Sequence, residues 1–172
     1  IGRMREPAGR VRILSEAERT ALLEACRASS NPALHPLVVM ALSTGARYGE
    51  LTDLRWVDVD FKRRRATFQV TKNGERRAVP IVGHAHDTLS EWAKVRRIDC
   101  DLVFPNRTGK GHTLRVAFYK AMETAEVTGF RFHDLRHTAA SYLAMSGATV
   151  SELAEILGHK TLQMVQRYSH LT

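Results

Sequence analysis

The sequence predicts a mainly α-helical domain with a small antiparallel β-sheet, an α+β fold, and three features indicate this. Helical spacing of apolar residues recurs along most of the 172 residues. Alternating patterns occupy two short segments, 66–70 and 77–81, which are rich in Val, Ile, Phe and Thr. Between them lies Asn73-Gly74, a pair typical of a hairpin turn. The apolar fraction of 44% is ordinary for a globular chain that buries a core.

Three helices are predicted before the hairpin. A capping box at Ser15–Glu18 begins the first, over about 16–28, and Asn31-Pro32 ends it. The apolar run 33–44 predicts a buried helix that stops at Gly45. A short helix is expected over 47–54.

After the hairpin, Pro80 predicts an edge strand, because proline cannot donate a hydrogen bond to a neighbouring strand. Residues 1–14 are expected to form a basic arm or interdomain linker, broken by Pro7, and residues 15–172 one domain. Further helices are predicted over about 85–96, 113–126, 133–146, 150–157 and 161–170, with loops around 102–111.

Positive charge is concentrated in two segments, residues 61–77 and the arm over 1–14. Lys and Arg number 26 against 18 Asp and Glu, a net charge of +8. Residues 61–77 alone contribute +6, since seven cations stand against Glu75. A solvated basic face or an anionic membrane surface are the alternatives, but clustered cations favour contact with a DNA phosphate backbone. The residues predicted to bind DNA are Lys62, Arg63, Arg64, Arg65, Arg76 and Arg77.

The sequence favours a cytoplasmic location. No apolar run approaches the roughly 18 residues of a membrane span, and no signal peptide is visible at the basic N-terminus. Cys26 and Cys100 could form one disulfide at most, which a chain of this size does not need. A reducing compartment is therefore expected.

Several polar residues stand where a helix begins or ends. Arg47 follows the helix stop at Gly45, and Glu50 lies three residues further on, at the spacing of an ion pair. His133 and Arg136 share one face at a helix N-terminus, and such an imidazole–guanidinium pair favours anion binding.

His137 is expected to point elsewhere as a packing histidine. With His133 it has the spacing of a metal pair, but Asp134 stands where a zinc protease helix has glutamate, and no third ligand follows. We therefore expect no metal. His159 directly follows a helix stop, and Tyr168 is either a packing residue or a nucleophile, because nearby cations and a base activate a phenol.

Together these strings resemble the catalytic domain of the tyrosine recombinase (phage integrase) family, over residues 15–171. The motifs occur in the family's order: Thr-Gly-x-Arg, a hairpin lysine, His-x-x-Arg, Leu-Gly-His and Arg-Tyr. By this resemblance Glu50 supports the first arginine. The six active-site positions that it implies are Arg47, Lys72, His133, Arg136, His159 and Tyr168.

The resemblance implies cleavage and rejoining of double-stranded DNA through a 3′-phosphotyrosine, with Tyr168 as nucleophile, His133 as general base and Lys72 as general acid. It implies no metal, cofactor or ATP, and a tetramer of recombinase protomers on DNA. A bacterial or phage origin and nucleoid association are expected. The alternatives are a type IB topoisomerase-like enzyme and a non-catalytic DNA-binding module.

Because the family's N-terminal core-binding domain is expected to be absent, residues 1–172 should bind DNA weakly. A single domain on one side of the duplex makes fewer phosphate contacts than two domains that surround it, and each contact adds affinity. A gel-shift titration at moderate salt measures this, and specific binding at nanomolar concentration would contradict the expectation.

Overall fold

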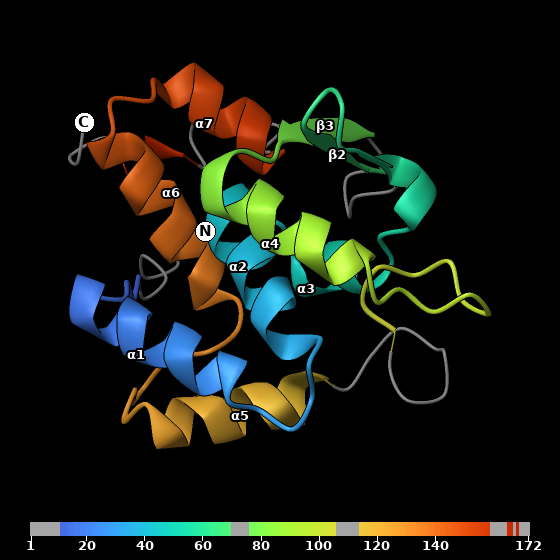
Figure 1. The fold of residues 1–172 in the computed structure, drawn as a ribbon. Helices are drawn as coiled ribbons and strands as arrows, with labels where there is room; N and C mark the ends of the chain where they lie inside the picture. The colour runs from blue at the N-terminus through green and yellow to red at the C-terminus, as the bar shows by residue number, and fades with distance from the viewer. Residues whose placement is uncertain (1–10, 70–75, 106–113, 159–164, 167, 169–172) are drawn as a thin grey trace, which may run out of the picture.

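The computed structural model describes residues 11–69, 76–105, 114–158, 165, 166 and 168, and helix α2 (Leu34–Thr44) lies at its centre (Figure 1). Leu34 and the five consecutive apolar residues from Leu37 to Ala41 are each at most 2% exposed. A helix that is apolar all round is stable only when other elements cover it. The covering helices are α1 (Glu16–Arg27), α4 (Gly83–Ala93) and α6 (Asp134–Met145).

Three further helices complete the helical part of the described structure. Helix α3 (Tyr48–Thr52) follows the turn at the end of α2, and α5 (Leu114–Thr124) packs against α1. Helix α7 (Val150–Leu157) packs against α6 and β3. The capping box predicted at Ser15 is confirmed, with Glu18 completing it. The predicted boundaries agree to within three residues, and the largest shift is in α4, which ends at Ala93 instead of residue 96.

The sheet has three antiparallel strands in the order β1 (Val59–Asp60), β2 (Arg65–Phe68) and β3 (Arg77–Pro80). The predicted pairing of the last two is confirmed, and β3 is an edge strand as the proline predicted. Strand β1 and the single turn of 3₁₀ helix before it, η1 (Trp56–Asp58), were not predicted, because two residues are too few to show alternation. The turn at Asn73-Gly74 lies outside the described residues.

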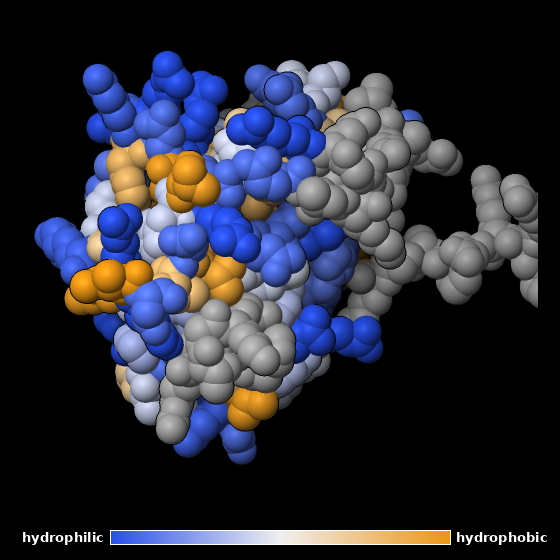
Figure 2. Space-filling model, turned by 90° about the vertical axis from the view of Figure 1, so that its right-hand side faces the viewer, coloured by the Kyte–Doolittle hydropathy of each residue, from blue (hydrophilic) through white to orange (hydrophobic). Residues whose placement is uncertain are grey.

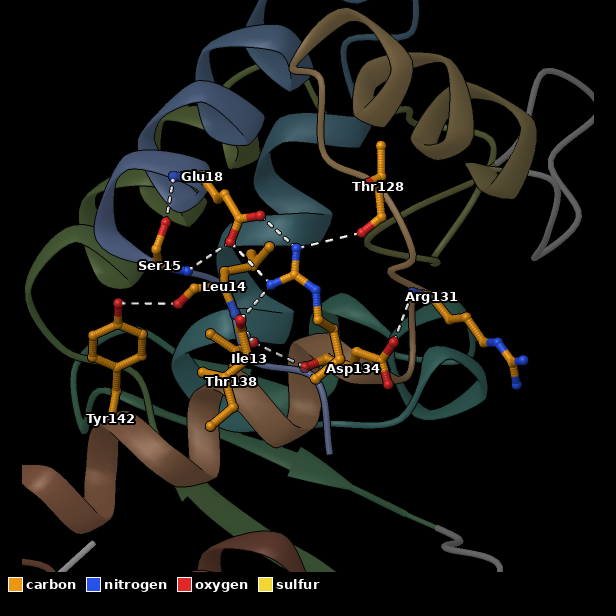
Figure 3. A network of polar contacts seen from close by, with 10 residues as sticks. Ile13, Leu14, Ser15, Glu18, Thr128, Arg131, Asp134, Thr138 and Tyr142 are labelled. Carbon is orange, nitrogen blue, oxygen red and sulfur yellow. Dashed lines mark hydrogen bonds and ion pairs between the residues drawn. The ribbon is translucent and has the colours of Figure 1, made fainter. Parts of the chain in front are cut away.

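The segment before α1 is not a free arm where the structure describes it. Leu14 is 2% exposed; its backbone N–H donates to Thr138 Oγ1 (3.1 Å) and its carbonyl accepts from the Tyr142 hydroxyl (3.3 Å) (Figure 3). Arg12 forms an ion pair with Glu18. Residues 12–14 therefore do not form a free arm, since an apolar side chain and two satisfied backbone groups hold them on α6; the arm or interdomain linker over 1–14 otherwise stays a prediction.

The surface carries hydrophobic side chains as separate patches among hydrophilic ones on the face shown in Figure 2. Single exposed apolar residues such as Val57 and Ile98 are normal for a folded domain. Within the described ranges, none of the helices has the length and apolar character needed to cross a membrane. Most of the predicted helix over 161–170 falls outside the described residues.

Candidate active site

A buried carboxylate, that of Glu50, lies at the centre of the site. It stands at the third position of α3, and its side chain is 4% exposed. Among the described residues, four hydrogen bonds reach its two oxygens. Arg47 donates from its backbone N (2.7 Å) and from Nη1 (3.0 Å), and Arg77 donates from Nη1 (2.6 Å) and Nη2 (2.9 Å). Glu50 thus contacts Arg47 directly, which is what the predicted support of this arginine requires.

Arg77 is placed differently from the prediction that it contacts DNA. Its side chain is 9% exposed and turned inward, with its guanidinium over the Phe68 ring (5.0 Å to the centroid) and Nε donating to the Ile156 carbonyl (3.1 Å). Alternation along β3 explains this, because Arg77 and the buried Val79 share one face of the strand. Arg77 therefore belongs to the interior of the site and not to an outer basic surface.

Arg136 joins the ends of two helices. It is 4% exposed, and it donates to the carbonyls of Gly45 (2.6 Å) and Leu157 (2.5 Å), at the C-terminal ends of α2 and α7. Gly45 has φ of +63°, and a Cβ there would lie 2.5 Å from Leu157 Cδ2. A glycine is therefore required both for the turn and for the close approach that brings these carbonyls to one guanidinium.

The site has more positive than negative charge. Burial lowers the pKa of Arg136 to about 9, and the charges of Arg47 and Arg77 act in the same direction, against those of Glu50 and Tyr168. Burial alone raises the pKa of Glu50, but hydrogen bonds and charge from Arg77 and then Arg47 outweigh it, so the pKa lies below its ordinary value. Three guanidinium groups thus face one carboxylate, which favours binding of a further anion.

Tyr168 lies beside this cluster. His137, which follows Arg136 on α6, is hydrogen-bonded through Nδ1 to the hydroxyl of Tyr168. The residue is 2% exposed. It packs in a small apolar cluster between α6 and α7, which contains Ala140, Ala144, Leu153, Leu157 and Val165. The aromatic ring of Tyr168 is thus both a packing group and a neighbour of the charged site.

The two histidines are placed differently from the prediction. His137, expected to pack elsewhere, contacts the Tyr168 hydroxyl and is half-buried. His133 is exposed, and its ring meets that of His137 edge-on with 5.3 Å between the centroids. The signal for His137 was its four-residue spacing from His133, which places both rings along one side of α6.

The remaining predicted residues are divided between three places. Lys72 and His159 lie outside the described residues. Arg76 is exposed beside the hairpin, whereas Lys62, Arg63 and Arg64 lie in the turn between β1 and β2. That turn is at the opposite end of β2 from the hairpin, so the cations predicted to bind DNA are divided between the two ends of this strand. Arg65 is exposed on β2, and Asp58 and Asp60 stand near it around a shallow hollow.

Replacing Glu50 with glutamine tests whether the carboxylate holds the cluster together. Two nearly buried guanidinium groups would lose their counter-charge, so Glu50→Gln should lower the free energy of unfolding by about 2–4 kcal/mol. Urea denaturation at neutral pH measures the loss. Glu155→Gln, an exposed position on α7, is the matched control and should change it by less than about 0.5 kcal/mol.

The same pair of proteins gives a pH dependence with a definite sign. Because the pKa of Glu50 is lowered on folding, its contribution is complete above its ordinary value of 4.5 and is lost as pH falls through the folded value. The stability difference between wild type and Glu50→Gln should therefore shrink on acidification below about 4.5. A difference that grew on acidification would show that this carboxylate is not ionised in the folded protein.

This chain is similar to known proteins over nearly all of its length. The model of the phage integrase family matches residues 12–172. The integrase of Salmonella phage P22 is 28% identical over 175 residues, which cover 94% of this chain and 44% of that protein. The shufflon-specific DNA recombinase of Escherichia coli is 32% identical over 164 residues, which cover 95% of this chain and 41% of that protein.

A solved structure shows the same fold. The catalytic domain of bacteriophage HP1 integrase has a TM-score of 0.75 and 33% identity, covering 95% of this chain and 89% of that one. The chain spans less than half the length of the two curated relatives. With the family model matching nearly all of the chain and the helical fold matching a solved member, the predicted resemblance is confirmed, and the chain belongs to the phage integrase family.

Proposed function

We propose that this chain is the catalytic domain of a site-specific DNA recombinase, an enzyme that cuts and rejoins DNA strands through a covalent 3′-phosphotyrosine. The observation that carries the proposal is that Arg47 and Arg77 hold Glu50, while Tyr168 packs in one cluster with Leu157, whose carbonyl Arg136 binds. An integrase and a DNA recombinase among the relatives support it. A phosphodiester is the anion that such a site and a phenol together can use.

Arg47 and Arg136 would bind the phosphate. Attack on a phosphodiester adds a second negative charge in the transition state, and fixed donors stabilise it most. A guanidinium has five N–H groups, so Arg136 can hold two carbonyls and still offer an edge to a non-bridging oxygen. Arg47, with a side chain 22% exposed, can do the same while Glu50 holds its Nη1.

The reaction exchanges one phosphoester for another. A bond forms between Tyr168 Oη and phosphorus, and the bond from phosphorus to the 5′ oxygen breaks. His133 takes the phenolic proton, and Lys72 protonates the departing 5′ oxygen, with His159 as a further donor to the phosphate. Bond energy is retained, so religation by a 5′-hydroxyl needs no ATP, and we propose that the enzyme uses no metal or cofactor.

Tyr168 would have to turn outward to react. A side chain that is 2% exposed does not meet a DNA phosphate where it stands. The hydrogen bond to His137 therefore belongs to a resting arrangement, in which the phenol is held in place. The exposed His133 beside it is the better acceptor once the hydroxyl has moved, because it lies on the open side of α6.

The proposed partners are double-stranded DNA and further recombinase protomers assembled on it as a tetramer. The exposed cations Lys62, Arg63, Arg64, Arg65 and Arg76 are the proposed backbone contacts. Since Arg76 flanks the hairpin that carries Lys72, it is the contact closest to the proposed chemistry along the chain.

Replacement of Tyr168 by phenylalanine tests the mechanism. A nicked duplex built from the DNA that flanks the gene traps the covalent intermediate, because the broken strand diffuses away. Wild type should give a protein–DNA band on a denaturing gel, and Tyr168→Phe should give none, because the attacking oxygen is missing.

Two controls accompany this gel. EDTA should leave the band unchanged, and its disappearance would show that the reaction requires a metal. Relaxation of supercoiled plasmid lacking the flanking DNA would indicate a topoisomerase instead. A Phe variant with full activity would exclude the tyrosine mechanism.

The two histidines should differ in the same assay. His133→Gln should slow formation of the covalent complex by about 100-fold or more, since it removes the proposed base. It should also flatten the dependence of the rate on pH. His137→Gln should change the rate less than about 10-fold, because its contact is made before attack. The reverse order of effects would assign the base to His137.

A further inference from the structure

Arg77 contacts more of the site than any role in DNA binding requires. We infer that it is a positioning residue of the proposed active site: through Glu50 it sets the orientation of Arg47, and it holds β3 against the end of α7. The inference rests on the proposed function, whereas the contacts of Arg77 do not depend on that function.

The first contact acts on Arg47 through Glu50. Oε1 of Glu50 accepts from Nη1 of both arginines, at 3.0 Å from Arg47 and 2.6 Å from Arg77. Nη2 of Arg77 holds the other oxygen at 2.9 Å. This two-pronged grip fixes the plane of the carboxylate, and that plane fixes where Arg47 can bind.

The second contact is with the end of α7. Nε of Arg77 donates to the Ile156 carbonyl (3.1 Å), one residue before the carbonyl that Arg136 uses. A Cβ on Gly158 would lie 2.9 Å from Arg77 Cδ, so the arginine runs directly over this glycine. The next residue in the chain is His159. Arg77 thus borders the turn from which that proposed phosphate donor emerges.

The third contact is with the base of the hairpin. Arg77 is paired with Phe68 across β2 and β3, the last described pair before the hairpin, and its guanidinium covers the Phe68 ring. Lys72 lies within the loop that this pair closes. One buried side chain therefore connects the segments that carry Arg47, Lys72 and His159, and its charge alone does not account for the forked contacts.

Three substitutions separate positioning from charge and from stability. Arg77→Ala removes every contact, Arg77→Lys keeps the charge without the fork, and Arg77→Gln keeps a short hydrogen-bonding group. The matched control is Arg97→Ala, which breaks a two-pronged arginine–aspartate pair at the surface. All variants are compared below their unfolding temperatures. If one of the three Arg77 variants does not fold, the comparison uses the other two.

The first readout is single-turnover cleavage of the nicked duplex together with its dissociation constant. Arg77→Ala should slow cleavage about 100-fold, and Arg77→Lys about 10-fold, with DNA affinity changed less than about 3-fold, because a small misplacement of reacting groups costs rate more than binding. Combining Arg77→Ala with Glu50→Gln should cost little more than the larger single effect, since Arg77 acts through Glu50.

The second readout does not depend on activity. In protein labelled with ¹⁵N-arginine, the Nε–H signals of Arg47 and Arg136, assigned through Arg47→Lys and Arg136→Lys, should shift in every Arg77 variant and stay in place in Arg97→Ala. Unmoved signals, or a wild-type cleavage rate in Arg77→Lys, would overturn the inference. Absence of any Tyr168-dependent complex in wild type would refute the proposed function, while the signals would still decide the role of Arg77.

Discussion

The site depends on one buried carboxylate. Removing Glu50 from water is costly, and the four hydrogen bonds that Arg47 and Arg77 donate offset that cost. In return, the carboxylate allows two guanidinium groups to lie next to a third in the domain interior. One negative charge cannot balance three positive ones, so these four side chains carry a net positive charge that favours binding of an anion. The same arrangement that permits folding thus also suits the phosphate binding that we propose.

Backbone carbonyls supply the rest of the compensation. The C-terminal end of a helix carries partial negative charge, and the end of α7 directs the carbonyls of Ile156 and Leu157 at two arginines. Gly45 and Gly158 make this geometry accessible, because a side chain at either would enter the space that Leu157 or Arg77 occupies. The helix ends therefore act as part of the site. Because Arg77 and Arg136 are bonded to the end of α7, any shift of this helix also moves these two arginines.

Local features of the sequence predicted most of the fold. The capping box at Ser15, the apolar run of α2 and the edge proline Pro80 each describe a contact made within a few residues or with the solvent-facing edge of a strand, and each is confirmed. Strand β1 was missed because its two residues pair only through the register of β2. The packing of Leu14 on Thr138 was missed because 124 residues separate them, and no local pattern encodes such a contact.

The predictions for the site divide along the same line. Arg47, Glu50 and Arg136 are brought together as the motifs indicated, whereas composition misled for Arg77, because clustered cations were counted without asking which face of the strand each occupies. The alternation that predicted β3 already placed Arg77 with Val79 on the inner face. A charged residue at an inward position must find a partner, and Glu50 is the buried acid within reach. In a basic run within a strand, alternate residues therefore point to the solvent and to the site.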